Sequence, residues 1–247
     1  QLDSLVAPWL AAAGICAIGL LLALAIRPDP RTIALALETD DEAEARPGTP
    51  SAPLREILSR PGVPTALVAA VASFAVMVGV MNLTGYIVVG HQHEQADVFT
   101  VISAHIVGMY ALVLVVGELV DRVGRRESAV AGLLLMAAST LPLWWVESVL
   151  WTSVALFGLG LGWSISYVAA AAVLVTYAAP EERGRLVGFT DLVSGLTGAS
   201  LALIGGVAYT EIGVAAVALG ATAIVAAPAL LIARRTVSPA IAADEPA

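Results

Sequence analysis

The ten residues GELVDRVGRR, at positions 117–126, form a charged joint between two long apolar stretches. Residues 98–117 lead into this joint and residues 128–146 follow it. Each stretch is close to the roughly 20 apolar residues that a helix needs to cross a bilayer. The pattern predicts that the chain crosses a membrane, turns within a few residues and crosses back.

The same alternation of apolar stretches and joints extends along the whole chain. Hydrophobic residues make up 59% of the 247 residues, above the roughly 45–50% of a soluble domain. The stretches do not alternate apolar and polar residues, as the strands of a membrane barrel do. We therefore predict an all-α integral membrane protein with seven transmembrane helices. Their apolar stretches are residues 4–26, 61–90, 98–117, 128–146, 148–180, 192–210 and 212–233.

The positions of the basic residues predict the topology. All twelve are arginines, and they fall at 27–60, 122–126, 183–185 and 234–235, which are alternate joints and the tail. Under the positive-inside rule these segments are cytoplasmic, so the C-terminus is predicted to be inside and the N-terminus outside. We expect a multi-pass plasma-membrane protein in contact with the lipid bilayer. Nothing in a chain of net charge −8 is basic enough to predict a nucleic-acid partner.

The spacing of the segments predicts four parts. Residues 1–26 form a single helix, residues 27–63 a cytoplasmic linker, residues 64–235 a six-helix bundle and residues 236–247 a cytoplasmic tail. The middle of the linker is acidic and rich in Pro, Gly and Ser, which is typical of a flexible segment. Its end, PLREILSRPG, is either more linker or a short helix on the membrane surface. Because the chain begins with Gln and leads almost directly into a span, we expect a fragment of a longer protein.

Six residues of the joint at 117–126 match the pattern G-x-x-x-D-R-x-G-R-R: Gly117, Asp121, Arg122, Gly124, Arg125 and Arg126. This pattern resembles the signature loop of the major facilitator superfamily (MFS), and residues 180–200 are similar to the next cytoplasmic joint of the same family. The resemblance implies an MFS-type bundle that contains helix six, the central loop and helices seven to twelve. The N-terminal half of the same protein would then be a missing partner. We expect Gly117 to permit a close helix crossing, and Asp121 to face a helix N-terminus or to pair with an arginine.

Two pairs of candidate metal ligands lie in the second and third spans. Met77 and Met81 are four residues apart, as are His105 and Met109, so each pair shares one helix face. At about 1.5 Å per residue, the two pairs come to similar depths near the middle of the membrane. Thioether sulfur and imidazole suit Cu(I). Apolar packing is the alternative explanation, because methionine is a common filler of cores.

The order MxxxM, then HxxxM, is similar to the CcoA-type copper importers of this superfamily, which are bacterial proteins. This resemblance implies copper as the transported substrate, with Met77, Met81, His105 and Met109 as its ligands. In the outer joint, His91 and His93 are either a capture point at the entrance or ordinary solvated loop residues. The chain is predicted to need no cofactor and to catalyse no covalent chemistry, so we do not expect an enzyme.

Asp191 lies within the sixth span, six residues after Arg185. It is predicted to pair with Arg183 or Arg185, or else to titrate during proton coupling. Two further functions remain open. One is proton-coupled transport of a small organic solute, for which His105 and Asp191 would matter while the methionines would tolerate Leu. The other is a non-transporting membrane sensor that binds a ligand without moving it. A rhodopsin is excluded, because a retinal Schiff base requires a lysine and the chain has none.

Overall fold

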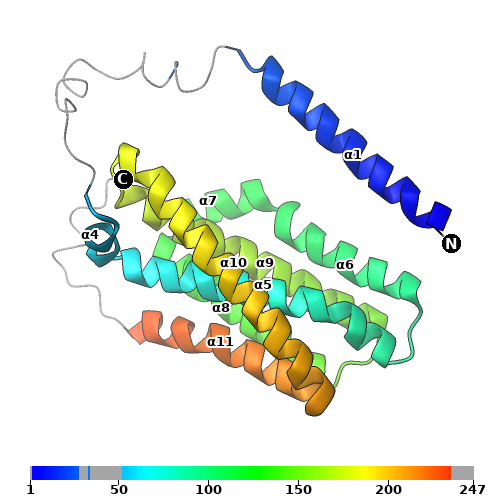
Figure 1. The fold of residues 1–247 in the computed structure, drawn as a ribbon. Helices are drawn as coiled ribbons and strands as arrows, with labels where there is room; N and C mark the ends of the chain where they lie inside the picture. The colour runs from blue at the N-terminus through cyan, green and yellow to red at the C-terminus, as the bar shows by residue number, and fades with distance from the viewer. Residues whose placement is uncertain (1, 28–32, 34–51, 235–247) are drawn as a thin grey trace. The chain divides into compact units, whose positions relative to one another are not determined.

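The computed structural model describes residues 2–27, 33 and 52–234 (Figure 1). The chain divides into two compact units, Gln1–Pro50 and Ser51–Ala247. The helix of the first unit is α1 (Leu2–Ala25). The predicted flexible middle of the linker and the predicted tail at 236–247 lie outside the described residues. Every element that the structure describes is helical, which confirms the all-α prediction.

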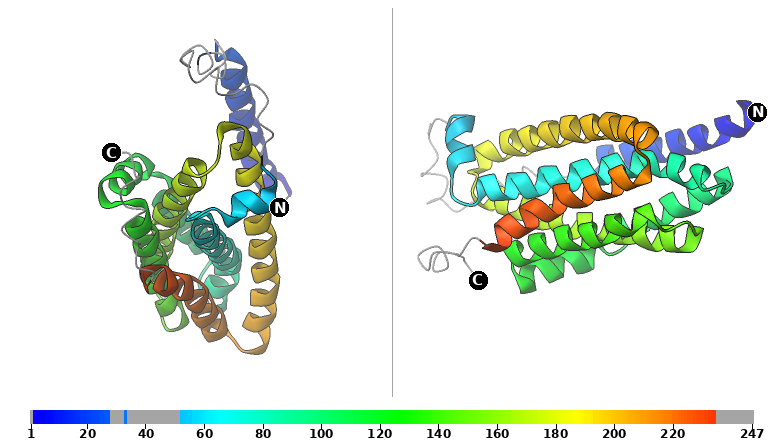
Figure 2. Two further views of the ribbon diagram at one scale, coloured as in Figure 1. Left: turned by 90° about the vertical axis from the view of Figure 1, so that its left-hand side faces the viewer. Right: turned by 90° about the horizontal axis from the view of Figure 1, so that it is seen from below.

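The second unit is a bundle of helices joined by short turns (Figure 2). In chain order its elements are α4 (Leu54–Ser59), α5 (Val63–Gly90), α6 (Gln95–Tyr110), α7 (Val113–Val123), α8 (Arg125–Thr140), the 3-10 helix η1 (Leu141–Trp144), α9 (Val149–Thr176), α10 (Pro180–Glu211) and α11 (Val214–Arg234).

Five of the described helices are long and apolar enough to cross a membrane: α5, α8 with η1, α9, α10 and α11. The predicted third span is not one straight helix, because α6 and α7 meet at a bend of 45°. Counted as one broken span, this pair makes a sixth crossing. The described apolar stretch of α1, Leu10–Ala25, is shorter. Seven full spans are therefore more than the described residues provide by this test.

The end of the predicted linker belongs to the bundle. The segment PLREILSRPG, predicted to be either linker or a short helix, forms the short helix α4. Its Ile57 is fully buried within the core cluster that also contains Val63 and Leu186. The apolar face of this helix thus packs on protein. A surface helix held only by lipid would have left Ile57 exposed.

The arginines of the second unit that make tertiary contacts do so at the end of the bundle where α4 lies (Figure 2). Arg125 at the start of α8 donates to Thr176 Oγ1 at the end of α9, at 2.6 Å. Arg126 donates to the carbonyl of Ile232 near the end of α11, at 2.9 Å. These contacts bring together the joints that the arginine pattern assigned to one side. The side of the membrane that they face stays a prediction.

Close helix packing centres on α9, whose GLGLG run faces two neighbours. A Cβ at Gly162 would lie 2.7 Å from the carbonyl oxygen of Gly132 and 2.8 Å from Met136 Cγ, both on α8. A Cβ at Gly160 would collide with the carbonyl of His105 on α6. Small residues therefore let three backbones meet.

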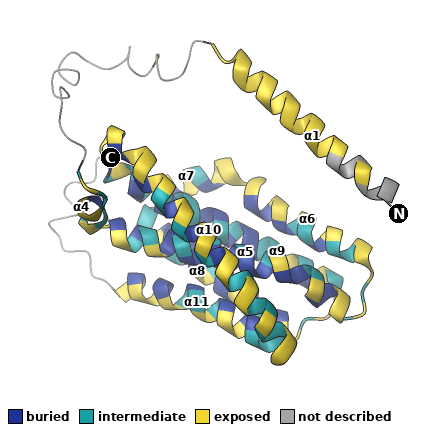
Figure 3. Cartoon of the chain, in the orientation of Figure 1, coloured by how far each residue is buried: buried dark blue, intermediate teal, exposed yellow. Residues whose placement is uncertain are grey.

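The helix α10 is the least covered of the described spans (Figure 3). Of the residues in its apolar stretch 11% are buried, against 61% in α5. Its contacts run chiefly along α5, against which Gly198 and Gly205 pack. The remaining faces of α10 are free to meet lipid or another part of a longer protein.

Candidate functional site

His105 on α6 is fully buried and is oriented by the backbone of α9. Its Nδ1 lies 2.8 Å from the carbonyl oxygen of Leu156. Because a carbonyl can only accept, Nδ1 carries the proton and Nε2 carries a lone pair in the neutral ring. That Nε2 atom is buried and has no hydrogen-bond partner among the described residues. An imidazole whose other nitrogen donates to a carbonyl is the usual state of a metal-ligating histidine.

The methionines of the two motifs lie in or against one core cluster. Met77 and Met109 are buried members of it, and Met81 is partly buried against it. Met109 rests on α9, since a Cβ at Gly160 would be 3.1 Å from its Cγ. Burial of this kind is also what apolar packing predicts. The unpaired Nε2 of His105 is therefore the feature of the candidate metal site that packing does not explain.

The fourth methionine, Met136 on α8, belongs to the same cluster but to neither motif. It is fully buried, and Ser166 Oγ lies 3.9 Å from its sulfur. Met136 is thus a core methionine that the metal hypothesis does not use, which makes it a natural control.

The two histidines of the outer joint have different surroundings. His93 Nε2 is hydrogen-bonded to the carbonyl of Glu147, which links the α5–α6 joint to the segment before α9. His91 directly follows α5, and its backbone N–H donates to the carbonyl of Ile87. Because a carbonyl can only accept, Nε2 of His93 donates, and Nδ1 is the ring nitrogen that remains for a ligand.

The signature residues turn the chain between α7 and α8. Gly124 has a φ of +103°, a conformation that favours glycine, and it both ends α7 and precedes α8. Arg122 pairs with Glu118 on the same helix at 2.7 Å. Among the described residues no helix crosses closely at Gly117, since a Cβ there would meet none of their atoms within 4 Å. Asp121 has no hydrogen bond or ion pair with any residue that the structure describes.

Asp191 on α10 has a different partner from the one expected. The hydroxyl of Tyr167 on α9 donates to its Oδ1 at 2.7 Å. Arg185 instead donates to the carbonyl of Ala52, and no ion pair joins Asp191 to either candidate arginine in the described ranges. Six residues turn a helix by about 600°, so Arg185 and Asp191 point to different faces.

An aromatic cluster that the sequence analysis did not single out surrounds Tyr167. Its ring stacks on Trp163 with centroids 5.3 Å apart and 21° between the planes. Tyr110 meets Trp163 edge-on at 6.2 Å, and Phe74 lies 6.0 Å from Tyr167. The indole Nε1 of Trp163 is buried without a partner in the described structure. The signal was available, since an aromatic pair four residues apart shares a helix face.

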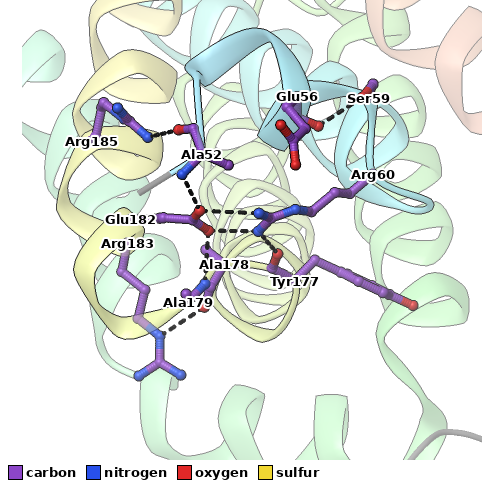
Figure 4. A network of polar contacts seen from close by, with 10 residues as sticks. All are labelled: Ala52, Glu56, Ser59, Arg60, Tyr177, Ala178, Ala179, Glu182, Arg183 and Arg185. Atoms are coloured by element: carbon purple, nitrogen blue, oxygen red, sulfur yellow. Dashed lines mark hydrogen bonds and ion pairs between the residues drawn. The ribbon is translucent and has the colours of Figure 1, made fainter. Parts of the chain in front are cut away.

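A polar network anchors α4 at the start of α10 (Figure 4). Arg60 donates both to Glu182 and to the carbonyl of Tyr177, while the backbone N–H groups of Ala52 and Ala179 donate to Glu182. Four of the first six residues of α10 are charged, so its membrane-spanning part begins after residue 185 and Glu182 lies outside it. The hydrogen bonds from Arg60, aided by those backbone groups, lower the pKa of Glu182 to about 2.

The charged turn between α7 and α8 and the comparison with known families point to the same family. The model of the Major Facilitator Superfamily matches residues 91–246. The chain belongs to this superfamily. It is accordingly a multi-pass membrane protein, and the signature residues at 117–126 lie within the matched range. The match also includes His105 and Met109, whereas Met77 and Met81 precede it.

Three relatives of this chain are named as transporters. An uncharacterised MFS-type transporter of Bacillus subtilis, YdeG, is 32% identical over 80% of this chain and 46% of its own length. The riboflavin transporter RfnT of Brucella anthropi is 32% identical over 57% of this chain and 35% of its own. A second uncharacterised MFS-type transporter of B. subtilis, YddS, is 26% identical over 74% and 42%. This MFS chain thus spans less than half the length of these relatives.

Proposed function

We propose that this chain is part of an MFS transporter that carries copper across the plasma membrane by alternating access. The observation that carries the proposal is the buried, unpaired Nε2 of His105. A buried polar atom without a partner is costly, and in a membrane span it points to a function. The resemblance of MxxxM and HxxxM to the CcoA-type importers supplies the choice of metal.

The ligand types suit Cu(I) chemically. A neutral imidazole and thioether sulfurs are the soft and borderline ligands that this ion accepts, and they carry no charge that would trap it. The bond from His105 to Leu156 fixes which nitrogen faces the ion. Met109 lies one turn further along the same helix face, and Met77 and Met81 would contribute from α5. In this proposal His91 and His93 lie at the outer entrance, and the C-terminus is cytoplasmic.

The second candidate is transport of a small organic solute. Two observations favour it: the aromatic cluster next to the exposed carboxylate of Asp191, and the relative named as a riboflavin transporter. In either case the transporter performs no covalent chemistry, in keeping with the transporter names of its relatives. The remainder of the transport path would come from the N-terminal half of the protein.

Copper uptake by cells that produce the full-length parent protein tests the first candidate. His105→Asn is the sharpest variant, because the asparagine amide can still donate to Leu156 while Nε2 is removed. Met77→Leu/Met81→Leu removes both sulfurs and nearly keeps the side-chain volume. We expect uptake to fall to background in both variants.

Met136→Leu is the matched control, because it makes the same exchange at a buried methionine outside the motifs. Each variant must reach the membrane in equal amount. Unchanged copper uptake in the two motif variants would overturn the copper proposal and leave the organic solute. Copper binding without flux in the wild type would instead indicate a sensor.

A further inference from the structure

Asp191 is a carboxylate inside a membrane span with no cation beside it. It lies six residues past Arg185, which at about 1.5 Å per residue is roughly 9 Å along α10. Its side chain is exposed and accepts a hydrogen bond from the hydroxyl of Tyr167. No basic side chain pairs with it among the described residues. An ionisable group at such a position cannot face lipid cheaply, so it marks a water-filled path or a binding site.

Aromatic rings extend away from this carboxylate. The ring of Tyr167 contacts that of Trp163, and the ring of Trp163 contacts that of Tyr110. Tyr110 lies at the end of α6 and is 58% exposed. The indole N–H of Trp163 is a further donor with no partner in the described part of the chain. These groups come from three helices, α6, α9 and α10, and the last is the least covered span.

We propose that Asp191, Tyr167, Trp163 and Tyr110 form a binding site for a small organic cation, such as a quaternary or protonated amine. A carboxylate attracts the charge, and aromatic rings stabilise a bound cation through their electron-rich faces. Rings alone would suit a neutral planar ligand equally well. The carboxylate of Asp191, which has no basic partner among the described residues, favours a cation.

The site uses none of the four residues proposed for copper, so the two proposals fail independently. In the full-length protein, the carboxylate of Asp191 pairs either with a free organic cation or with a basic side chain from another part of the protein. The first would make the site accessible to added ligand. The second would leave the carboxylate already paired and closed to it.

Calorimetric titration of the purified full-length parent with benzyltrimethylammonium tests the proposal. Neopentylbenzene is the matched neutral compound, because it replaces the charged nitrogen by carbon. We expect saturable binding of the cation and none of the neutral compound. Asp191→Asn should weaken cation binding by about tenfold or more, because a charge-assisted contact is lost. Trp163→Leu should weaken it as well.

Two controls separate this site from its surroundings. Glu118→Gln removes an exposed acid already paired with Arg122 and should leave binding unchanged. Met136→Leu should also leave it unchanged, because this buried methionine lies outside the aromatic cluster and outside both motifs. The proposal is overturned if the cation does not bind, or if it binds Asp191→Asn and wild type equally. If the wild type binds no cation and Asp191→Asn lowers the melting temperature, a basic side chain of the protein pairs with Asp191 instead.

Discussion

The guanidinium of Arg60 meets the carboxylate of Glu182 through two hydrogen bonds, Nη1 to Oε2 at 2.6 Å and Nη2 to Oε1 at 3.0 Å. The residues are 122 positions apart, and this contact joins the end of α4 to the start of α10. Arg60 also donates to the carbonyl of Tyr177 at the end of α9. Through these bonds Arg60 holds together three segments at one end of the bundle (Figure 4).

Breaking this pair should loosen the start of α10. Because α10 has few buried residues along its length, the anchor is a large part of what holds its first turn. We expect Glu182→Gln and Arg60→Lys both to lower the melting temperature of the full-length parent in detergent, since an ammonium cannot make the two parallel bonds. Hydrogen exchange should rise in α4 and in the first turns of α10.

Glu118→Gln provides the comparison for that anchor. It removes an exposed i,i+4 pair with Arg122, which is typically worth only roughly 0.3–0.5 kcal/mol. Its melting temperature should stay close to that of the wild type. Equal effects at Glu118 and Glu182 would contradict the anchoring role.

The same anchor predicts a dependence of stability on pH. The hydrogen bonds from Arg60 and the backbone hold the pKa of Glu182 at about 2 in the folded protein, against an ordinary value of 4.5. A lowered pKa stabilises the folded state fully above about pH 4.5, and this stabilisation is lost as pH falls toward 2. The melting-temperature difference between wild type and Glu182→Gln should therefore be constant from pH 7 to 5 and shrink below it. A difference that grows on acidification would contradict this assignment.

The sequence predicted the spans well because a bilayer imposes a simple rule on length and apolarity. It missed the break between α6 and α7, since residues 98–117 contain no Asp, Glu, Lys or Arg and no proline marks the bend. It also missed the anchor. Arg60 and Glu182 are far apart in the chain, and nothing in either neighbourhood names the other as its partner.

The candidate site was predictable only in part. Spacing of four residues placed His105 and Met109 on one face, but not which helix that face would meet. The bond from His105 to Leu156 depends on how α6 packs on α9, which local sequence does not specify. The pairing of Asp191 failed for a simpler reason, because the prediction counted residues and not helix faces.

The glycines of α8 and α9 give a packing prediction. A Cβ at Gly132 would lie 2.5 Å from the backbone nitrogen of Ser166 and 2.6 Å from the carbonyl oxygen of Gly162. These are backbone atoms and cannot move alone, so Gly132→Ala should destabilise the full-length parent by about 1–3 kcal/mol. Gly220→Ala on α11 is the control, because its Cβ would meet no atom of the described residues within 4 Å. Thermal unfolding in detergent measures both variants, and a neutral Gly132→Ala would show that the helices are further apart.

X-ray absorption of the purified full-length parent loaded with Cu(I) would test the proposed ligands directly. The proposal requires both sulfur and nitrogen neighbours of the metal. Met77→Leu/Met81→Leu should reduce the sulfur contribution, and His105→Asn should reduce the nitrogen contribution while its amide can still donate to Leu156. Met136→Leu should leave the spectrum unchanged, because this methionine packs by Ser166 and belongs to neither motif. If Met136→Leu changed the sulfur signal and the motif variants did not, the copper would lie elsewhere, and Met77 and Met81 would be core residues.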